Sequence, residues 1–302
     1  MNIDQVYDEL YGVIDRNKAA DAATQGKVAA LEGTVTTQGE TIAALQTVIP
    51  EVPGRQLKLV DLGTEYTQEL KEDIYSGAFE KAIVGGYLTI NSHVYILAHP
   101  DYWLHKGNAE TTAHHMLVIP AGNLGTGAMN LTNIITGGYQ NSDMRAGHED
   151  TTDPSAPVHV DGALQAVIDI IEEDFGAENI LSHKEIFTNH TDTNAADGWS
   201  WVDSEVDLMN EIMVFGSTIN ASSVNYECGI DNTQIKLFAE RPDLTTFRSD
   251  WWLRCIASEG KFCKVANNGV ASKDNATAVL GIRPVFAIKG APPETRTRKR
   301  KG

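Results

Sequence analysis

Apolar residues recur every seven positions along residues 3–49, a pattern that the rest of the chain does not share. With Tyr7 as the first a position and Ile3 as the first d position, ten of the fourteen seam positions are apolar. No proline interrupts the pattern before Pro50. Such a repeat predicts a helix that supercoils and buries its seam against copies of itself. We therefore expect a coiled-coil stalk over residues 1–50 and a linker over 51–56.

The middle of this predicted stalk is its weakest part. Four seam positions are polar, and each of the glycines at 26, 33 and 39 costs a helix up to about 1 kcal/mol relative to alanine. The helix therefore needs assembly, and its β-branched a positions with leucine at d favour a dimer. A single amphipathic helix packed on its own head is the alternative. The residues expected to drive assembly are Ile14, Val28, Leu31, Val35, Ile42 and Leu45.

Residues 57–290 alternate short helical patterns with short β-rich runs. Helices are predicted over 67–82, 161–175 and 204–215, because apolar residues recur there at helical spacing beside capping residues and glycines. Two β-rich runs around a polar turn predict a hairpin over 87–98, and the apolar run at 285–288 predicts a buried strand. This alternation indicates an α+β head, separate from the stalk.

The charge is strongly negative, at −17 for the 302 residues. Residues 291–302 carry five basic groups and one acid, which leaves −21 for the rest of the chain. Because this part of the chain is strongly acidic, it repels phosphate backbones, and we expect no nucleic-acid binding by the folded part. The basic end is predicted to be a disordered, solvated tail, with contact to an anionic partner as the alternative.

No apolar run is long enough to span a bilayer, and the first residues lack the features of a signal peptide, so membrane insertion and Sec export are not expected. The three cysteines, Cys228, Cys255 and Cys263, have no zinc-site spacing and are expected to be free thiols. The histidines between 93 and 159 form no HExxH motif, so no metal site is predicted there. No cofactor is expected, although calcium binding is left open at two acidic stretches. Their acids are Glu149, Asp150, Asp153, Asp192 and Asp197.

Residues 250–290 carry a set of short motifs in a fixed order. They are Trp252-Leu253-Arg254, Phe262 with Val265, Asn267-Asn268-Gly269, and Gly281-Ile282-Arg283-Pro284 with Phe286. Upstream stand TGGYQNSDMR, EVDLMNEIMVFGS and LFAERPDL. This order resembles the C-type-lectin-like domains found in structural proteins of Firmicutes and gut phages, and the resemblance covers about residues 75–290. It implies a fold class of α+β: an N-terminal α-helical coiled-coil stalk followed by a C-type-lectin-like head with short helices and a small antiparallel sheet.

The resemblance also implies a function. The chain would be a phage virion fibre protein of the head or tail, made in the host bacterial cytoplasm and displayed on the particle surface for host attachment. Phage fibres are commonly trimers, so a homotrimer is preferred here over the dimer. Expected partners are other virion proteins, through the stalk, and a host surface glycan or protein. A purely structural capsid decoration or baseplate subunit is the alternative. No enzyme activity is expected, since GxSxG, P-loop and helix-opening GxGxxG motifs are absent from the sequence.

Within the resembling segment, apolar and basic residues are expected to form the scaffold. Arg254 and Arg283 stand among apolar residues, so their guanidinium groups should be hydrogen-bonded to backbone carbonyls or acids. The polar residues between these elements are expected on loops that contact a receptor, because loops on a rigid scaffold commonly carry recognition. A plain solvated surface is the alternative. The candidate receptor-binding residues are Ser258, Glu259, Lys261, Lys264, Asn267, Asn268, Ser272, Lys273, Asp274 and Asn275.

Overall fold

A computed structural model describes residues 17, 24–28, 57–189, 198–222 and 233–293 of the chain. The chain divides into two compact units, residues 1–55 and 56–302. In the first unit the described residues are Asn17 and those from 24 to 28, and all are helical. Most of the predicted stalk therefore lies outside the described residues. Among the predicted assembly residues only Val28 is described, and its side chain is 49 % exposed.

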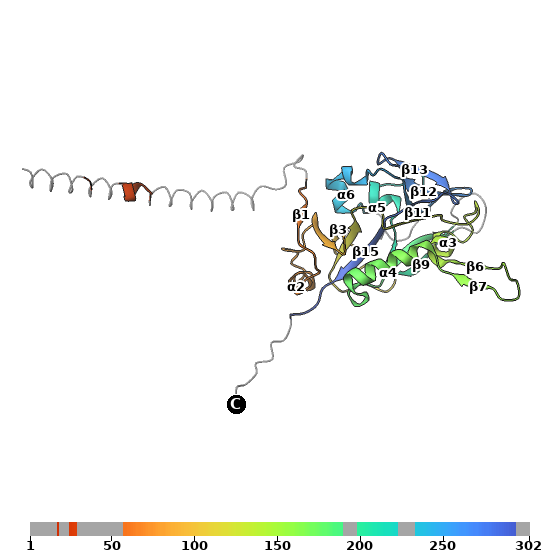
Figure 1. Ribbon diagram of the computed structural model, residues 1–302, viewed down its shortest axis with the longest axis horizontal. Coiled ribbons are helices and arrows are strands. Elements are labelled where there is room, and N and C mark those ends of the chain that lie inside the picture. Colours follow the sequence, from red (N-terminus) through yellow and green to blue (C-terminus); the bar gives the residue numbers. More distant parts are fainter. Residues whose placement is uncertain (1–16, 18–23, 29–56, 190–197, 223–232, 294–302) are drawn as a thin grey trace, which may run out of the picture. The chain divides into compact units, whose positions relative to one another are not determined.

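The second unit is built on two sheets (Figure 1). The larger has six strands in the order β1-β2-β3-β4-β15-β10. Their bounds are Val60–Asp61, Gly86–Ile90, His93–Pro100, His115–Pro120, Pro284–Lys289 and Val206–Leu208. Strand β15, from far along the sequence, pairs antiparallel with β4 on one side and with β10 on the other. The predicted hairpin is confirmed as β2 and β3, and Asn91 and Ser92 form its turn with positive φ.

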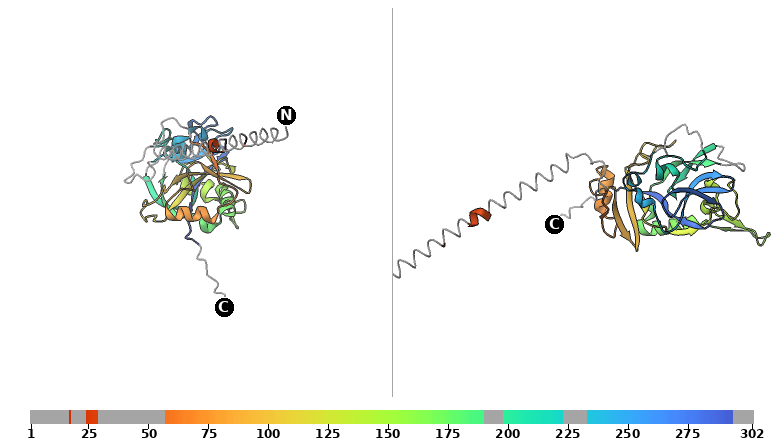
Figure 2. Two further views of the ribbon diagram at one scale, coloured as in Figure 1. Left: turned by 90° about the vertical axis from the view of Figure 1, so that its left-hand side faces the viewer. Right: turned by 90° about the horizontal axis from the view of Figure 1, so that it is seen from above.

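The second sheet has five strands in the order β13-β12-β11-β14-β5. Their bounds are Ala271–Asn275, Lys261–Val265, Trp251–Ser258, Leu280–Ile282 and Gly125–Gly127. Two further hairpins pair β6 (His148–Asp150) with β7 (Val158–Val160), and β8 (His183–Asn189) with β9 (Gly198–Ser204). The β6–β7 hairpin extends away from the body of this unit (Figure 2). Strand β13 is an outer edge, so one side of its backbone is not paired within the sheet.

The described helices are short, apart from α4 at Ala163–Phe175. Helix α2 (Gln68–Ser76) begins after the cap residue Thr67 and ends at Gly77, earlier than predicted. The carboxylate of Asp73 accepts the backbone amides of residues 80, 81 and 82, which holds this stretch in a turn. The remaining helices are α3 at Asp143–Ala146, α5 at Glu211–Phe215, α6 at Lys236–Glu240, and the 3-10 turns at Tyr139–Asn141, Ala177–Asn179 and Pro242–Thr245.

The helix predicted over 204–215 is wrong in its first half. Residues Val206–Leu208 form strand β10, because they pair with the open side of β15. Helix α5 begins only after Asn210, whose side chain accepts the amide of Met213 at 2.8 Å. Ser204 donates to the carboxylate of Asp207 at 2.7 Å and caps no helix. Helix α4 likewise begins later than predicted, at Ala163 after Gly162 and not at Asp161.

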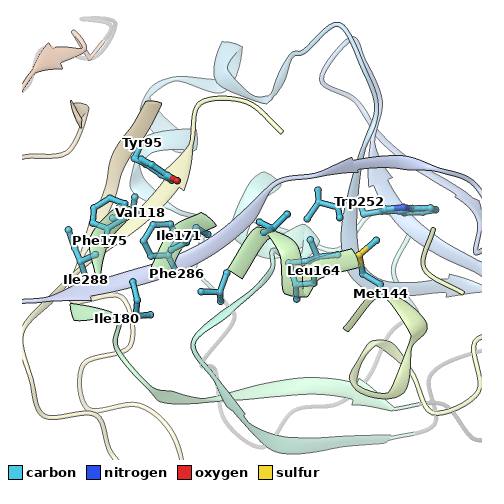
Figure 3. Packing of buried hydrophobic residues seen from close by; sticks show 14 of the residues in the cluster. Tyr95, Val118, Met144, Leu164, Ile171, Phe175, Ile180, Trp252, Phe286 and Ile288 are labelled. Carbon is cyan, nitrogen blue, oxygen red and sulfur yellow. The ribbon is translucent and has the colours of Figure 1, made fainter. Parts of the chain in front are cut away.

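The strands bury both of their faces. Phe286 and Ile288 of β15 lie in one hydrophobic cluster, and Val285 and Ala287 lie in a second cluster. Helix α4 covers the first face, where Phe175 packs against Phe286 with ring centroids 5.3 Å apart (Figure 3). Helices α5 and α6 contribute to the second cluster. Burial on both faces explains why these strands appear in the sequence as unbroken apolar runs.

The predicted fold class is wrong. Strands account for 34 % of the structure and helices for 23 %, so the fold is mixed but dominated by β-structure, and the described residues contain no long coiled-coil stalk. The prediction counted the polar stretches as loops. Many of them are strands, because an edge strand such as β13 needs only backbone pairing on one side and tolerates polar side chains. A heptad pattern predicts a stable helix only when a partner helix buries the apolar seam.

Candidate binding surface

The segment predicted to carry recognition is mostly a β-hairpin and not a set of loops. Strands β12 and β13 pair in register from Lys261 with Asn275 to Val265 with Ala271. Of the predicted residues, five are exposed and five are half-buried. The exposed residues are Glu259, Asn267, Asn268, Lys273 and Asn275, and the half-buried ones are Ser258, Lys261, Lys264, Ser272 and Asp274.

Lys264 has a structural role within this hairpin. Its ammonium lies 2.5 Å from the carboxylate of Asp250 and 2.7 Å from that of Asp274. Burial acts to lower the pKa of Lys264, but the two hydrogen bonds outweigh it and raise the pKa above its usual value. The ammonium is thus already occupied by two carboxylates of its own chain, so Lys264 and Asp274 hold the strands together.

Strand β12 is connected to β11 by a turn at one of its ends and to β13 by a turn at the other. Asn267 and Asn268 belong to the β12–β13 turn, where the amide of Asn267 donates to Asp250 at 2.8 Å. Glu259 belongs to the β11–β12 turn, and Asn275 is paired with Lys261 beside it. The predicted residues therefore form two separate groups. The first lies beside Asp250 and the 3-10 turn at Pro242–Thr245, and the second lies beside the loop at 130–134.

Three turns come together at that end, and we name them the turn cluster: residues 130–134, 259–260 and 275–279. The side-chain oxygen of Asn133 accepts the amide and the hydroxyl of Thr277, at 3.2 and 2.8 Å. The amide of Ala276 donates to the Gly260 carbonyl at 2.8 Å. The amide of Asn130 donates to the Ala276 carbonyl at 3.0 Å, which closes the connection between all three turns.

The loop at 130–134 is also anchored to helix α3. The Asn130 side chain accepts the amide of Asp143 at 2.9 Å and donates to the Ile134 carbonyl at 2.7 Å. The Asp143 carboxylate in turn accepts the amide of Leu131 at 2.7 Å. These bonds fix both ends of the loop, so its exposed side chains are presented from a defined backbone.

Three large apolar side chains on the turn cluster are exposed to solvent. The exposed fraction is 64 % for Leu131, 51 % for Ile134 and 67 % for Val279. Exposed apolar residues on turns that are held together by hydrogen bonds make this end a candidate interaction surface. Leu131, Ile134, Val279 and Asn133 were not among the residues predicted to bind a receptor. The available signal was weak: apolar residues placed within a stretch rich in asparagine and threonine.

The scaffold residues take the predicted places. Trp251, Trp252, Phe262 and Phe286 are fully buried. Arg254 pairs with the carboxylate of Glu185 and donates to the Leu208 carbonyl at 3.0 Å. The expected partners of both buried arginines are therefore confirmed, since Arg283 also bonds to carbonyls.

Arg283 is buried without a carboxylate. It donates to the carbonyls of Pro120 and Leu244, both at 2.9 Å, and its guanidinium lies 4.3 Å from the ring centre of Phe247. Burial lowers the pKa of Arg283 to about 9. Backbone carbonyls and aromatic faces thus take the place of a counter-ion and tie β15 to the segments before and after it.

The cysteines and the acids considered as metal ligands are the remaining predicted site residues. Cys255 and Cys263 are buried free thiols on neighbouring strands, and the contact with Cys255 together with burial raises the pKa of Cys263. Asp150 and Asp153 accept hydrogen bonds from Thr152 and Ser155 within their own turns. Within the described ranges no three histidines, cysteines or acids are grouped to hold a metal ion. Cys228, Asp192 and Asp197 lie outside the described residues.

In the part of the chain that the structure describes, no helix has the length and apolar character needed to cross a membrane. Comparison of the chain with families of known proteins, with curated proteins and with solved structures gives no match.

Proposed function

We propose that this chain is a surface protein of a phage particle that binds a molecule of the host cell surface through the turn cluster. The observation that carries the proposal is the exposure of Leu131, Ile134 and Val279 on three turns that hydrogen bonds hold together. A preorganised surface loses little conformational entropy on binding, and exposed apolar side chains gain from being covered.

The phage context of the proposal rests on the motif order of residues 250–290. In that resemblance the tryptophan and arginine elements are the scaffold and the segments between them face outward. The burial of Trp252, Arg254 and Arg283 and the exposure of Glu259 and the turn cluster agree with this division. Location on the virion, assembly into a homotrimer and synthesis in the host cytoplasm remain predictions. The alternative function is that of a structural decoration or baseplate subunit with no receptor.

Adsorption of the labelled full-length protein to a panel of Firmicutes cells tests the proposal. Leu131→Asp and Val279→Asp should each weaken binding at least about fivefold, equivalent to about 1 kcal/mol, because a charge would enter the covered surface. Val270→Asp is the matched control, since Val270 is 53 % exposed but lies in the turn at the other end of the hairpin. Binding that is absent, or equal in all three variants, would favour the structural alternative.

A further inference from the structure

Two adjoining hollows of about 310 Å³ each lie beside the β8–β9 hairpin. They share Ser182 and Asp203. We name them together the acidic groove, because four of the residues that line them are acids: Glu110, Asp203, Glu205 and Asp207. The groove is separate from the turn cluster and shares no residue with it.

The two bases that line the groove are already paired. The Nζ of Lys184 lies 2.6 Å from Asp203. The guanidinium of Arg145 bonds to the carboxylate of Asp207 at 2.7 Å and to the carbonyl of Asp203 at 3.0 Å. Four carboxylates against two cations leave the groove with an excess of negative charge. Its ligand should therefore carry positive charge.

The lining of the groove further limits which ligands fit it. The hollow that holds the exposed Glu205 is also lined by the half-buried Ile168, while its other apolar residues, Leu164 and Val206, are buried. A lysine or arginine side chain matches this arrangement, since its methylene stem packs on apolar surface while its charged end reaches an acid. Glu205 forms no ion pair with the described residues, and Glu110 lies 3.5 Å from the exposed His105.

The sequence itself contains one dense basic run. Residues 296–301 hold five bases and no acid, against −21 for residues 1–290. The chain leaves the folded body beside helix α2, where the amide of Ala291 donates to the Lys71 carbonyl and the Gln68 side chain donates to the Pro292 carbonyl. The groove lies close to the last strand, because the amide of Leu181, next to Ser182, donates to the Ala287 carbonyl at 2.9 Å.

The reach of the chain is sufficient. Six Cα–Cα steps lead from Ala287 to Pro293, so Ser182 and Pro293 are at most about 30 Å apart. The nine residues from Pro293 to Lys301 are joined by eight Cα–Cα steps and span up to about 29 Å, and a lysine side chain adds about 6 Å. We propose that the basic run at 296–301 docks in the acidic groove of its own chain, with its lysines or arginines against Glu205 and Glu110. Any other ligand of the groove would have to displace it.

Zero-length carbodiimide cross-linking of the full-length protein, followed by mass spectrometry, tests this inference. At low ionic strength Lys299 or Lys301 should join to Glu205, Asp203 or Glu110, and 0.5 M NaCl should reduce the yield at least about fivefold by screening. Cross-links mainly to Glu69 and Glu72 of helix α2, beside the exit of the chain, would overturn the proposal. An absence of cross-links would do the same.

Two further measurements make the test specific. Replacing Arg298 and Arg300 together by serine should lower the yield of the groove cross-links several-fold, while Arg248→Ser, a change at an exposed arginine elsewhere, should not. An equal mixture of unlabelled and ¹⁵N-labelled protein should give cross-linked peptides of a single label. Peptides of mixed label would show docking between copies and overturn the same-chain arrangement.

Discussion

Strand β11 and the turn cluster adjoin one another, yet different interactions hold each in place. Trp251 and Trp252 of β11 are buried in the two hydrophobic clusters on opposite faces of the strand. In the turn cluster, by contrast, the largest side chains are in solvent, and Asn133 and backbone amides connect the turns. The difference shows that a surface can be conformationally defined without being buried. Substitutions should therefore affect stability in β11 and binding in the turn cluster.

The largest expected effect is in the buried strand. Trp252→Ala should lower the free energy of unfolding by about 3–5 kcal/mol, because the indole is fully buried and donates to the Gly127 carbonyl at 2.9 Å. Urea denaturation measures the change. Leu131→Ala in the turn cluster is the counterpart and should cost no more than about 0.5 kcal/mol. Equal costs for the two substitutions would remove the distinction between the regions.

Arg283 provides a second test of the buried region. Arg283→Met should lower the free energy of unfolding by about 2–3 kcal/mol, since the carbonyls of Pro120 and Leu244 would lose their donors inside the protein. Arg248→Met, at an exposed position, should have little effect in the same denaturation experiment. A neutral Arg283→Met would mean that packing on the aromatic rings alone holds this segment.

The buried region should also respond to pH through His115. Burial lowers the pKa of this fully buried histidine to about 4, so only the unfolded chain takes up the proton near pH 6. Stability is therefore complete above about pH 6.5 and falls as the pH is lowered toward 4, by up to about 1.4 kcal/mol per pH unit for one such group. Burial lowers the pKa of His99 to about 4 as well.

Unfolding measured between pH 4 and 7 tests the role of His115. His115→Gln should remove about half of the slope that the two histidines produce. An unaltered slope in His115→Gln would assign the pH dependence to other groups.

Gly260 tests the turn cluster itself. Its φ is +61°, and an added Cβ would lie 2.8 Å from the backbone oxygen of Asn133. Gly260→Ala should therefore destabilise the protein by about 1–2 kcal/mol and separate the two turns. Gly198→Ala is the control, because nothing lies within 4 Å of its Cβ position. The melting temperature and the adsorption to cells should both decrease for Gly260→Ala. Neither should decrease for Gly198→Ala.

The smallest difference should be between two lysines of the hairpin. Lys264→Ala should cost about 0.5–1 kcal/mol through its ion pairs with Asp250 and Asp274, whereas the exposed Lys273→Ala should cost less. The difference should shrink in 0.5 M NaCl. If it does not, packing of the Lys264 stem accounts for the cost.

Local pattern was enough to predict some elements of this fold. The hairpin of β2 and β3, helix α4 and strand β15 each follow from apolar spacing and turn residues within a single short stretch. The expected burial of Trp252 and of both arginines followed from their apolar neighbours. These features depend mainly on sequence close by, so they could be found without the rest of the chain.

The remaining features depend on contacts that are distant in the sequence. Strand β10 exists because Val206 pairs with Phe286, and helical spacing at 204–215 gave no sign of that partner. Asn133 and Thr277 are 144 positions apart, so no local pattern could predict the turn cluster. Polar strand β13 resembles a loop because only its backbone pairing with β12 makes it a strand.

Strand β15 lies between β4 and β10 in the larger sheet, although residues 284–289 come late in the chain. Neither neighbour can complete its ladder before these residues are available, so the sheet cannot close until residue 289 has left the ribosome. Such a high contact order predicts slow folding with a long interval in which apolar strands are open to aggregation. Recombinant production should therefore benefit from low temperature and added chaperones, and truncation before residue 289 should yield insoluble protein.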